Sequence, residues 1–123
     1  MTNSVKGVVT REIDGKTYGF RLGTNEWCEL EDALGKSTTA IVRDLEAMAK
    51  GKDVDQRLFR AIFRAALSFS DPEATAHDAG NMMESMGLEA AGLLVVEVVQ
   101  LGMPKQTAGA KRPAGKPKRV GRP

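Results

Sequence analysis

Residues 13–37 read IDGKTYGFRLGTNEWCELEDALGKS, and the pattern of this stretch changes along its length. The pair Asp14-Gly15 is a signal for a tight two-residue turn, because glycine adopts a positive φ freely. Alternating residues lie on both sides of this pair, which predicts a β-hairpin over residues 5–22. Helical periodicity replaces the alternation after Gly23. The stretch therefore predicts a hairpin that leads directly into a helix.

The turn also sets the register of the predicted hairpin, because every residue of one strand then faces a defined partner on the other. The expected pairs are Ile13 with Lys16, Arg11 with Tyr18, Val9 with Phe20, and Gly7 with Leu22. One face then carries Val9, Phe20, Leu22 and the ring of Tyr18. An isolated hairpin is marginally stable in water, so we expect this face to pack on the helices that follow.

The first predicted helix follows the hairpin. Thr24 or Asn25 can serve as its N-cap, and Gly35 supplies a left-handed stop after its last turn. Its apolar residues recur at spacings of three and four: Trp27, Leu30 and Leu34. We expect these side chains to organise the junction between the hairpin and the helices.

Capping signals predict three more helices. Their starts are Ser37 or Thr38 for the second helix, Asp53 with a capping box to Gln56 for the third, and Asp71 with Pro72 at the first helical position for the fourth. The third helix has the widest apolar stripe, which predicts that it lies at the centre of the core. Arg57, Arg60 and Arg64 run beside that stripe, and we interpret them as a solvated flank rather than a phosphate-binding row.

Residues 88–101 read LEAAGLLVVEVVQL, and their valines favour a strand as well as a helix. At roughly 100° per residue, Glu89, Glu97 and Gln100 fall within an arc of about 80° on a helix. A strand would place Gln100 on the face opposite both glutamates. The sequence therefore predicts a fifth helix that is apolar around most of its circumference.

Together these elements predict an α+β fold, mostly α, with an N-terminal β-hairpin followed by about five short helices. At 123 residues the chain can bury one modest core, which we place in a single compact domain over residues 1–102. Charge divides at the same boundary, because residues 1–102 carry a net charge of −5 and residues 103–123 carry +7. The second segment is rich in Pro, Gly and cations without an apolar period, which predicts a disordered basic tail.

The residues that carry most enzyme chemistry are sparse in this chain. Cys28 and His77 are the only cysteine and the only histidine, so an internal disulfide and a Cys/His metal site are excluded. We interpret Cys28 as a small buried side chain and His77 as a helix-flank residue. Glu29 and Asp32 lie on the polar side of a short helix, where nothing desolvates a carboxylate for acid–base work.

Nucleotide and membrane sites are not predicted either. The letters GKS at residues 35–37 match the end of a P-loop, but the position of its first glycine holds Leu30. The longest apolar run, residues 93–99, is too short for a bilayer and is interrupted by Glu97. No signal-peptide pattern opens the chain. We therefore expect a non-catalytic, cytoplasmic protein that uses no cofactor and contacts no membrane.

Apolar residues beyond the needs of a small core predict a partner surface. Methionines adapt to apolar partners, although they also fill cores, and the fourth helix carries Met82, Met83 and Met86. A terminal helix of a small bundle rarely needs to be apolar almost all round, so we expect the fifth helix to contact a partner chain or a second copy. Its candidate contact residues are Leu94, Val95, Val98 and Val99.

The basic tail offers a separate surface. Its candidate phosphate contacts are Lys111, Arg112, Lys116, Lys118, Arg119 and Arg122. The alternative is a tail that only solubilises the chain or tethers it by charge. The acidic body predicts that the folded domain itself does not dock on nucleic acid.

Taken in order, these features resemble a known family. The hairpin turn, a strand that ends in FRL and a helix that carries CELEDALG are similar to the small tail-assembly chaperones of gene transfer agents and long-tailed phages, also labelled tail tube-associated. The resemblance covers about residues 5–100, and the basic tail from Lys105 departs from the family pattern. Its most specific residues are Gly15, Tyr18, Leu22, Leu30, Glu31, Leu34 and Gly35.

The resemblance implies a non-catalytic protein that binds the long helical tape-measure protein, or other tail proteins, and prevents aggregation during tail assembly. Two alternatives remain open from the residues. In a structural role, the hairpin adds edge strands to neighbouring copies and builds a ring or tube. In an accessory role, the basic tail binds nucleic acid while the acidic body faces away.

Overall fold

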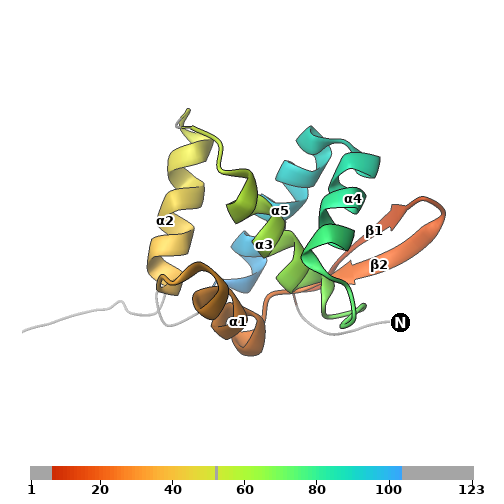
Figure 1. The fold of residues 1–123 in the computed structure, drawn as a ribbon, viewed down its shortest axis with the longest axis horizontal. Helices are drawn as coiled ribbons and strands as arrows, with labels where there is room; N and C mark the ends of the chain where they lie inside the picture. The colour runs from red at the N-terminus through yellow and green to blue at the C-terminus, as the bar shows by residue number, and fades with distance from the viewer. Residues whose placement is uncertain (1–6, 52, 104–123) are drawn as a thin grey trace, which may run out of the picture.

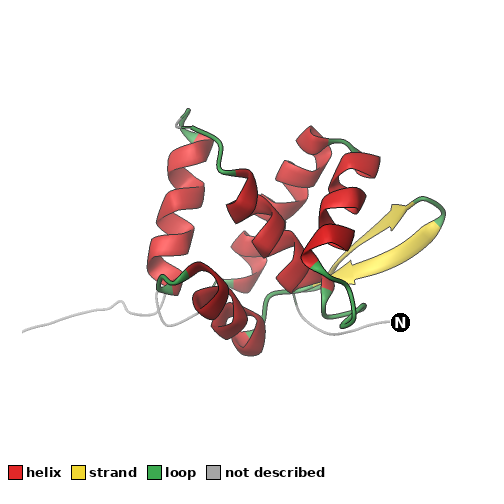
Figure 2. Cartoon of the chain, in the orientation of Figure 1, coloured by secondary structure: helices red, strands yellow, loops and turns green. Residues whose placement is uncertain are grey.

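The computed structural model describes residues 7–51 and 53–103 of the chain. A two-stranded antiparallel hairpin precedes five α-helices, which confirms the predicted fold class (Figure 1, Figure 2). The elements are β1 (Val9–Ile13), β2 (Lys16–Phe20), α1 (Thr24–Leu34), α2 (Thr38–Ala49), α3 (Gln56–Leu67), α4 (Ala76–Met86) and α5 (Leu88–Gly102). The predicted tail, from residue 104 onward, lies outside the described residues.

The hairpin has the predicted register over its length. The antiparallel pairs run from Val9 with Phe20 to Ile13 with Lys16. In the turn between them, Asp14 and Gly15 have φ angles of 54° and 83°, as a primed two-residue turn requires. The ladder stops before the predicted pair of Gly7 and Leu22. Leu22 still joins the core, with 3% of its surface exposed.

The centre of the core is α3, as its wide apolar stripe predicts. This helix packs against α1, α4, α5 and β2, while α2 packs chiefly against α1 and stands on the side of the domain away from the hairpin (Figure 1). Its buried residues are Leu58, Ile62, Phe63, Ala65, Ala66 and Leu67. Phe63 meets Phe20 of β2 edge to face, with 5.0 Å between the ring centroids. This aromatic contact joins the hairpin to the helices.

The buried face of α1 links the first helix to the last. Trp27 and Leu30 are buried, and Leu34 is half-buried against the same core. The indole Nε1 of Trp27 donates a hydrogen bond of 2.8 Å to the carbonyl oxygen of Gly102, at the end of α5. Leu30 and Leu34 lie on the helix that packs chiefly against α3. The three predicted junction residues therefore hold α1 to other helices.

The N-cap of α1 is Gly23 rather than the predicted Thr24 or Asn25. The N–H of Gly23 donates to a carboxylate oxygen of Glu26 at 2.8 Å, so an acidic residue of the first turn completes the cap. A side chain at position 23 would collide with the guanidinium of Arg21. The guanidinium is the end of a flexible side chain, so a substitution at position 23 requires Arg21 to move.

The N-cap of α3 is Asp55, not the predicted Asp53. The Asp55 carboxylate accepts hydrogen bonds from the N–H groups of Arg57 and Leu58, at 3.0 and 3.2 Å. A cap must directly precede the first helical residue for its side chain to reach these free donors. The start of α3 is therefore two residues later than the capping-box pattern suggested.

The start of α4 also differs from the prediction. Thr75 is the N-cap, and its side chain forms a reciprocal capping box with Asp78. Asp71 and Pro72 belong instead to a turn in which the N–H of Ala74 donates to the carbonyl of Asp71 at 3.1 Å. Ala74 is buried, so this turn is anchored to the core before the helix begins.

A carboxylate joins α1 to α2. Glu31 Oε2 accepts hydrogen bonds from the N–H and the hydroxyl of Thr38, at 2.8 and 2.9 Å. Both bonds favour the charged form and hold the pKa of Glu31 below its ordinary value of 4.5. The charged form of Glu31 therefore contributes to the stability of this helix connection.

Glu31→Gln keeps an acceptor oxygen but removes the charge, so we expect a lower melting temperature at neutral pH. Because the folded-state pKa of Glu31 is lowered, its contribution is present above the unfolded-state pKa and is lost as the pH falls through the folded-state pKa. The gap in melting temperature between wild type and variant should be widest near neutrality and close at pH values below 4.5. Glu46→Gln, at an exposed position of α2, is the control. A gap that does not depend on pH would contradict the assignment.

Candidate partner-binding groove

The predicted contact residues of α5 lie in the core. Leu94, Val95 and Val98 are 1% exposed, and Val99 is 3% exposed. With Ala91 they follow helical periodicity, and α5 packs against α3, α4 and β1. No partner can reach these side chains while the domain is folded. The prediction that they contact a partner is therefore corrected.

The methionines of α4 belong mainly to the core as well. Met83 is 5% exposed, and Met82 and Met86 are half-buried against the same cluster. Their gap-filling role, which the sequence left open, accounts for this packing. Of the three, Met83 also borders a surface groove.

The exposed apolar side chains lie at other positions. The large ones among the described residues are Val54 (63% exposed), Phe69 (41%), Leu88 (53%), Leu93 (68%) and Leu101 (51%). Leu93 falls outside the helical periodicity of the buried α5 residues, and this was the one sequence signal for its exposure. Val54 lies before α3, and nothing in its local pattern brings it near α5.

Three of these residues, Val54, Leu88 and Leu93, line one groove of about 480 Å³ between the start of α3 and the first half of α5. The other lining residues are Gln56, Phe59, Met83, Glu89 and Gly92. We call this the α3–α5 groove. Phe59 and Met83 are its least exposed side chains, so they form its base. Its lining is predominantly apolar, as expected for a site that receives an apolar side chain.

Gly92 keeps the α3–α5 groove open. It lies in the interior of α5, where glycine costs a helix roughly 0.5–1 kcal/mol relative to alanine. A Cβ at this position would meet nothing within 4 Å. Packing within the domain therefore does not require a glycine here, and a larger side chain would project into the open space of the groove that Gly92 lines.

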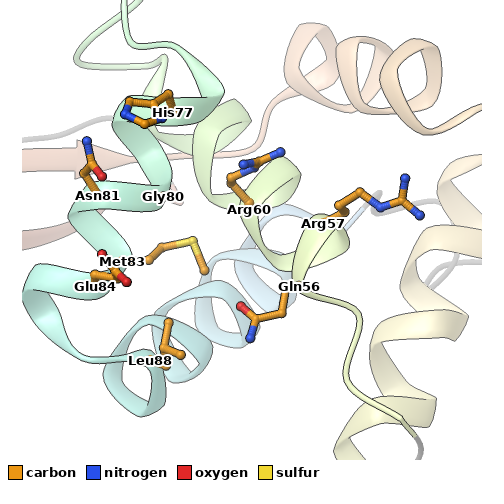
Figure 3. A pocket seen from close by; sticks show the side chains of 9 residues that line it. All are labelled: Gln56, Arg57, Arg60, His77, Gly80, Asn81, Met83, Glu84 and Leu88. Carbon is orange, nitrogen blue, oxygen red and sulfur yellow. The ribbon is translucent and has the colours of Figure 1, made fainter.

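A second hollow, of about 390 Å³, lies between α3 and α4. Its lining residues are Gln56, Arg57, Arg60, His77, Gly80, Asn81, Met83, Glu84 and Leu88 (Figure 3). We call it the basic hollow, because its cationic side chains outnumber its single carboxylate. In Figure 3, Met83 extends from α4 toward α3, with Gln56 and Leu88 beside it. These three residues also line the α3–α5 groove, so the two depressions are contiguous.

The arginines of α3 differ in their pairing. Arg64 forms an ion pair of 3.2 Å with Glu29 of α1. No ion pair or side-chain hydrogen bond within residues 7–51 and 53–103 involves the guanidinium groups of Arg57 and Arg60. Arg60 rests its aliphatic stem near Gly80, where a Cβ would lie 3.5 Å from Cδ of Arg60. Arg57 and Arg60 are therefore exposed as a solvated flank predicts, whereas Arg64 joins α3 to α1.

The described residues hold no buried polar or charged side chain and no group of three or more metal-ligating residues. Cys28 is exposed rather than buried, because the buried face of α1 is formed by Trp27 and Leu30. The pKa of Asp78 is lowered by its hydrogen bonds from Thr75, which is a helix-cap effect. Shape and surface charge are therefore the features that define the site.

The predicted phosphate contacts of the tail, from Lys111 to Arg122, lie outside the described residues. Among the helices that the structure describes, none has the length and hydropathy needed to span a bilayer. Comparison of the chain with protein-family models, with curated proteins and with solved structures finds no match. The groove, the hollow and the pattern of the sequence are therefore the features that indicate a function.

Proposed function

We propose that this protein is a non-catalytic assembly chaperone that binds an amphipathic helical segment of a tape-measure protein during tail construction. The observation that carries the proposal is the α3–α5 groove, in which Val54, Leu88 and Leu93 expose apolar surface around Gly92. The resemblance of residues 5–100 to small tail-assembly chaperones supports the identity of the partner. The groove supports the mode of binding.

A helix bound in a groove presents apolar side chains at spacings of three and four residues. Leu93 and Leu88 border the groove from α5, and Val54 borders it from the segment before α3. Each apolar side chain of a partner that is buried here contributes roughly 1.5–3 kcal/mol before the entropy cost of association. Such a site favours reversible binding, which suits a protein that must release its client.

The loss of helix stability caused by Gly92 supports a binding function. Replacement by a better helix former is sterically allowed within the domain, because a Cβ at Gly92 would meet no other atom within 4 Å. A residue that lowers helix stability without a packing reason fits a position at which a partner must approach closely. This is the expected compromise between stability and function at a binding site.

The test uses a fluorescent amphipathic peptide of about 18 residues with one leucine stripe, which is long enough to form several helical turns when bound. Leu93→Asp should weaken its binding roughly 10- to 100-fold, because a charge replaces an apolar contact. Leu101→Asp is the matched control, since Leu101 is 51% exposed on the same helix but does not line the groove. Gly92→Leu is a second variant that should weaken binding by filling the groove while it preserves the helix.

Equal affinities for Leu93→Asp and Leu101→Asp, or no binding of any such peptide by the wild type, would contradict the proposal. Elution of the wild type from a gel-filtration column as a particle large enough to be a ring or rod would favour the structural alternative. In that alternative the hairpin adds strands to its neighbours, and the hydroxyl of Ser70 already occupies part of the β2 edge through two hydrogen bonds with Gly19, at 3.0 and 2.8 Å.

A further inference from the structure

We propose that the α3–α5 groove and the basic hollow form one docking surface that selects a helix with apolar anchors, a carboxylate-bearing end and a cationic end. The carboxylates lie over Arg57 and Arg60, and the cations lie toward Glu89. This inference rests on the proposed function, because it specifies the client that the groove accepts. It adds a charge pattern to the apolar recognition described above.

The α3–α5 groove and the basic hollow are contiguous. Gln56, Met83 and Leu88 line both depressions, so a single ligand can occupy them together. The shared residues come from α3, α4 and the start of α5. A helix of three to four turns covers roughly 16–22 Å along its axis, which is enough to extend from one depression into the other.

The basic hollow and the α3–α5 groove carry charges of opposite sign. Arg57, Arg60 and His77 line the hollow, and Glu84 is the one carboxylate among its lining residues. The α3–α5 groove has the opposite charge, since Glu89 contributes its only charged side chain. Asp53 and Asp55 flank Val54, which lines the groove, and add to the negative charge. The surface therefore combines a positive hollow with an apolar groove that carries negative charge.

Arg57 and Arg60 carry guanidinium groups that have no ion-pair partner among the described residues. Arg11 and Arg64 form ion pairs across elements, at 2.7 and 3.2 Å, whereas Arg57 and Arg60 have none among the described residues. Unpaired arginines beside a hollow can form bidentate bonds with carboxylates at no cost of breaking an internal pair. Asn81 adds a side-chain amide donor to the same lining. These donors favour acidic side chains on the bound helix.

The experiment measures the affinity of full-length protein for three synthetic peptides with the same leucine stripe. One has an acidic end and a basic end, one is acidic at both ends, and one is basic at both ends. The first should bind roughly 3- to 10-fold more tightly than either of the others at low salt. This preference should shrink in high salt, because exposed charges are screened.

Arg60→Glu should abolish the preference for the mixed peptide and favour the peptide that is basic at both ends. Arg57→Glu tests the second arginine in the same way. Arg43→Glu is the matched control, because it makes the same charge change at an exposed position of α2 and does not line either depression. The expected result for Arg43→Glu is an unchanged order of the three affinities.

Four other results would overturn the inference. Equal binding of all three peptides, with Arg60→Glu no different from Arg43→Glu, would refute the charge pattern but leave the proposed function intact. Dimerisation of the wild type that Leu93→Asp prevents would assign the groove to a second copy. Binding of a short oligonucleotide that Arg60→Glu removes would assign the hollow to nucleic acid. Failure of every peptide to bind would contradict the proposed function itself.

Discussion

Leu94→Asp is expected to abolish the cooperative unfolding transition, whereas Leu93→Asp is expected to keep a melting temperature close to that of the wild type. The two residues are adjacent in α5, but Leu94 is 1% exposed and Leu93 is 68% exposed. A carboxylate at position 94 would be buried without a partner and would also leave a cavity, at a cost of at least about 4 kcal/mol. A domain of about 100 residues has roughly 5–15 kcal/mol of stability to lose.

Circular dichroism during thermal and urea unfolding measures this difference. Leu94→Met is the control, because a change that nearly conserves volume should cost less than about 1.5 kcal/mol. A cooperative transition of Leu94→Asp at the wild-type midpoint would contradict the burial of this side chain. It would also return α5 to the candidate binding surfaces that the sequence suggested.

Phe63→Ala is expected to lower the free energy of unfolding by about 3–5 kcal/mol, because it removes a large side chain from the centre of the core. Phe63 is 1% exposed, and its ring contacts that of Phe20 at an interplanar angle of 63°. The edge-to-face contact adds roughly 0.5–1.5 kcal/mol to the burial of the two rings. Because Phe20 lies in β2, this substitution should loosen the hairpin as well as α3.

Urea unfolding of the single and double alanine variants of Phe63 and Phe20 measures the coupling between the two rings. Phe69→Ala is the control, since Phe69 is 41% exposed and should cost less than about 1 kcal/mol. Additive losses from Phe63 and Phe20 would show that the hairpin and the helices are stabilised separately. A loss for Phe63→Ala no larger than that for Phe69→Ala would contradict the central position of α3.

If both core variants unfold and the groove variants do not, the domain separates its stabilising residues from its binding residues. Leu93 and Leu94 then provide the sharpest demonstration, because one substitution tests the surface and the other tests the core. The buried face of α5 is not accessible to a partner, and the candidate contact residues that the structure exposes are Val54, Leu88 and Leu93. The acidic body has a local basic region around Arg57 and Arg60, which net charge alone does not reveal.

Turn chemistry and hydrophobic periodicity determined much of the fold from the sequence. Asp14-Gly15 set the hairpin register, since a two-residue turn admits one pairing of the flanking strands. Gly35 ended α1, and the angular position of Gln100 relative to Glu89 and Glu97 identified α5 as a helix. These features depend on residues close together in the chain. Helix starts were less certain, because several capping residues such as Asp71 and Thr75 competed and core packing selected among them.

The candidate binding surface was decided by the tertiary structure. Val54, Met83 and Leu93 come from three separate segments, and only the packing of α3 against α4 and α5 brings them to one groove. Apolar content suggested that α5 had surface to spare, and helical periodicity set Leu93 apart from the buried face, but neither placed Val54 beside it. Burial depends on how many neighbouring elements cover a helix face, and that number is a property of the assembled fold rather than of local sequence.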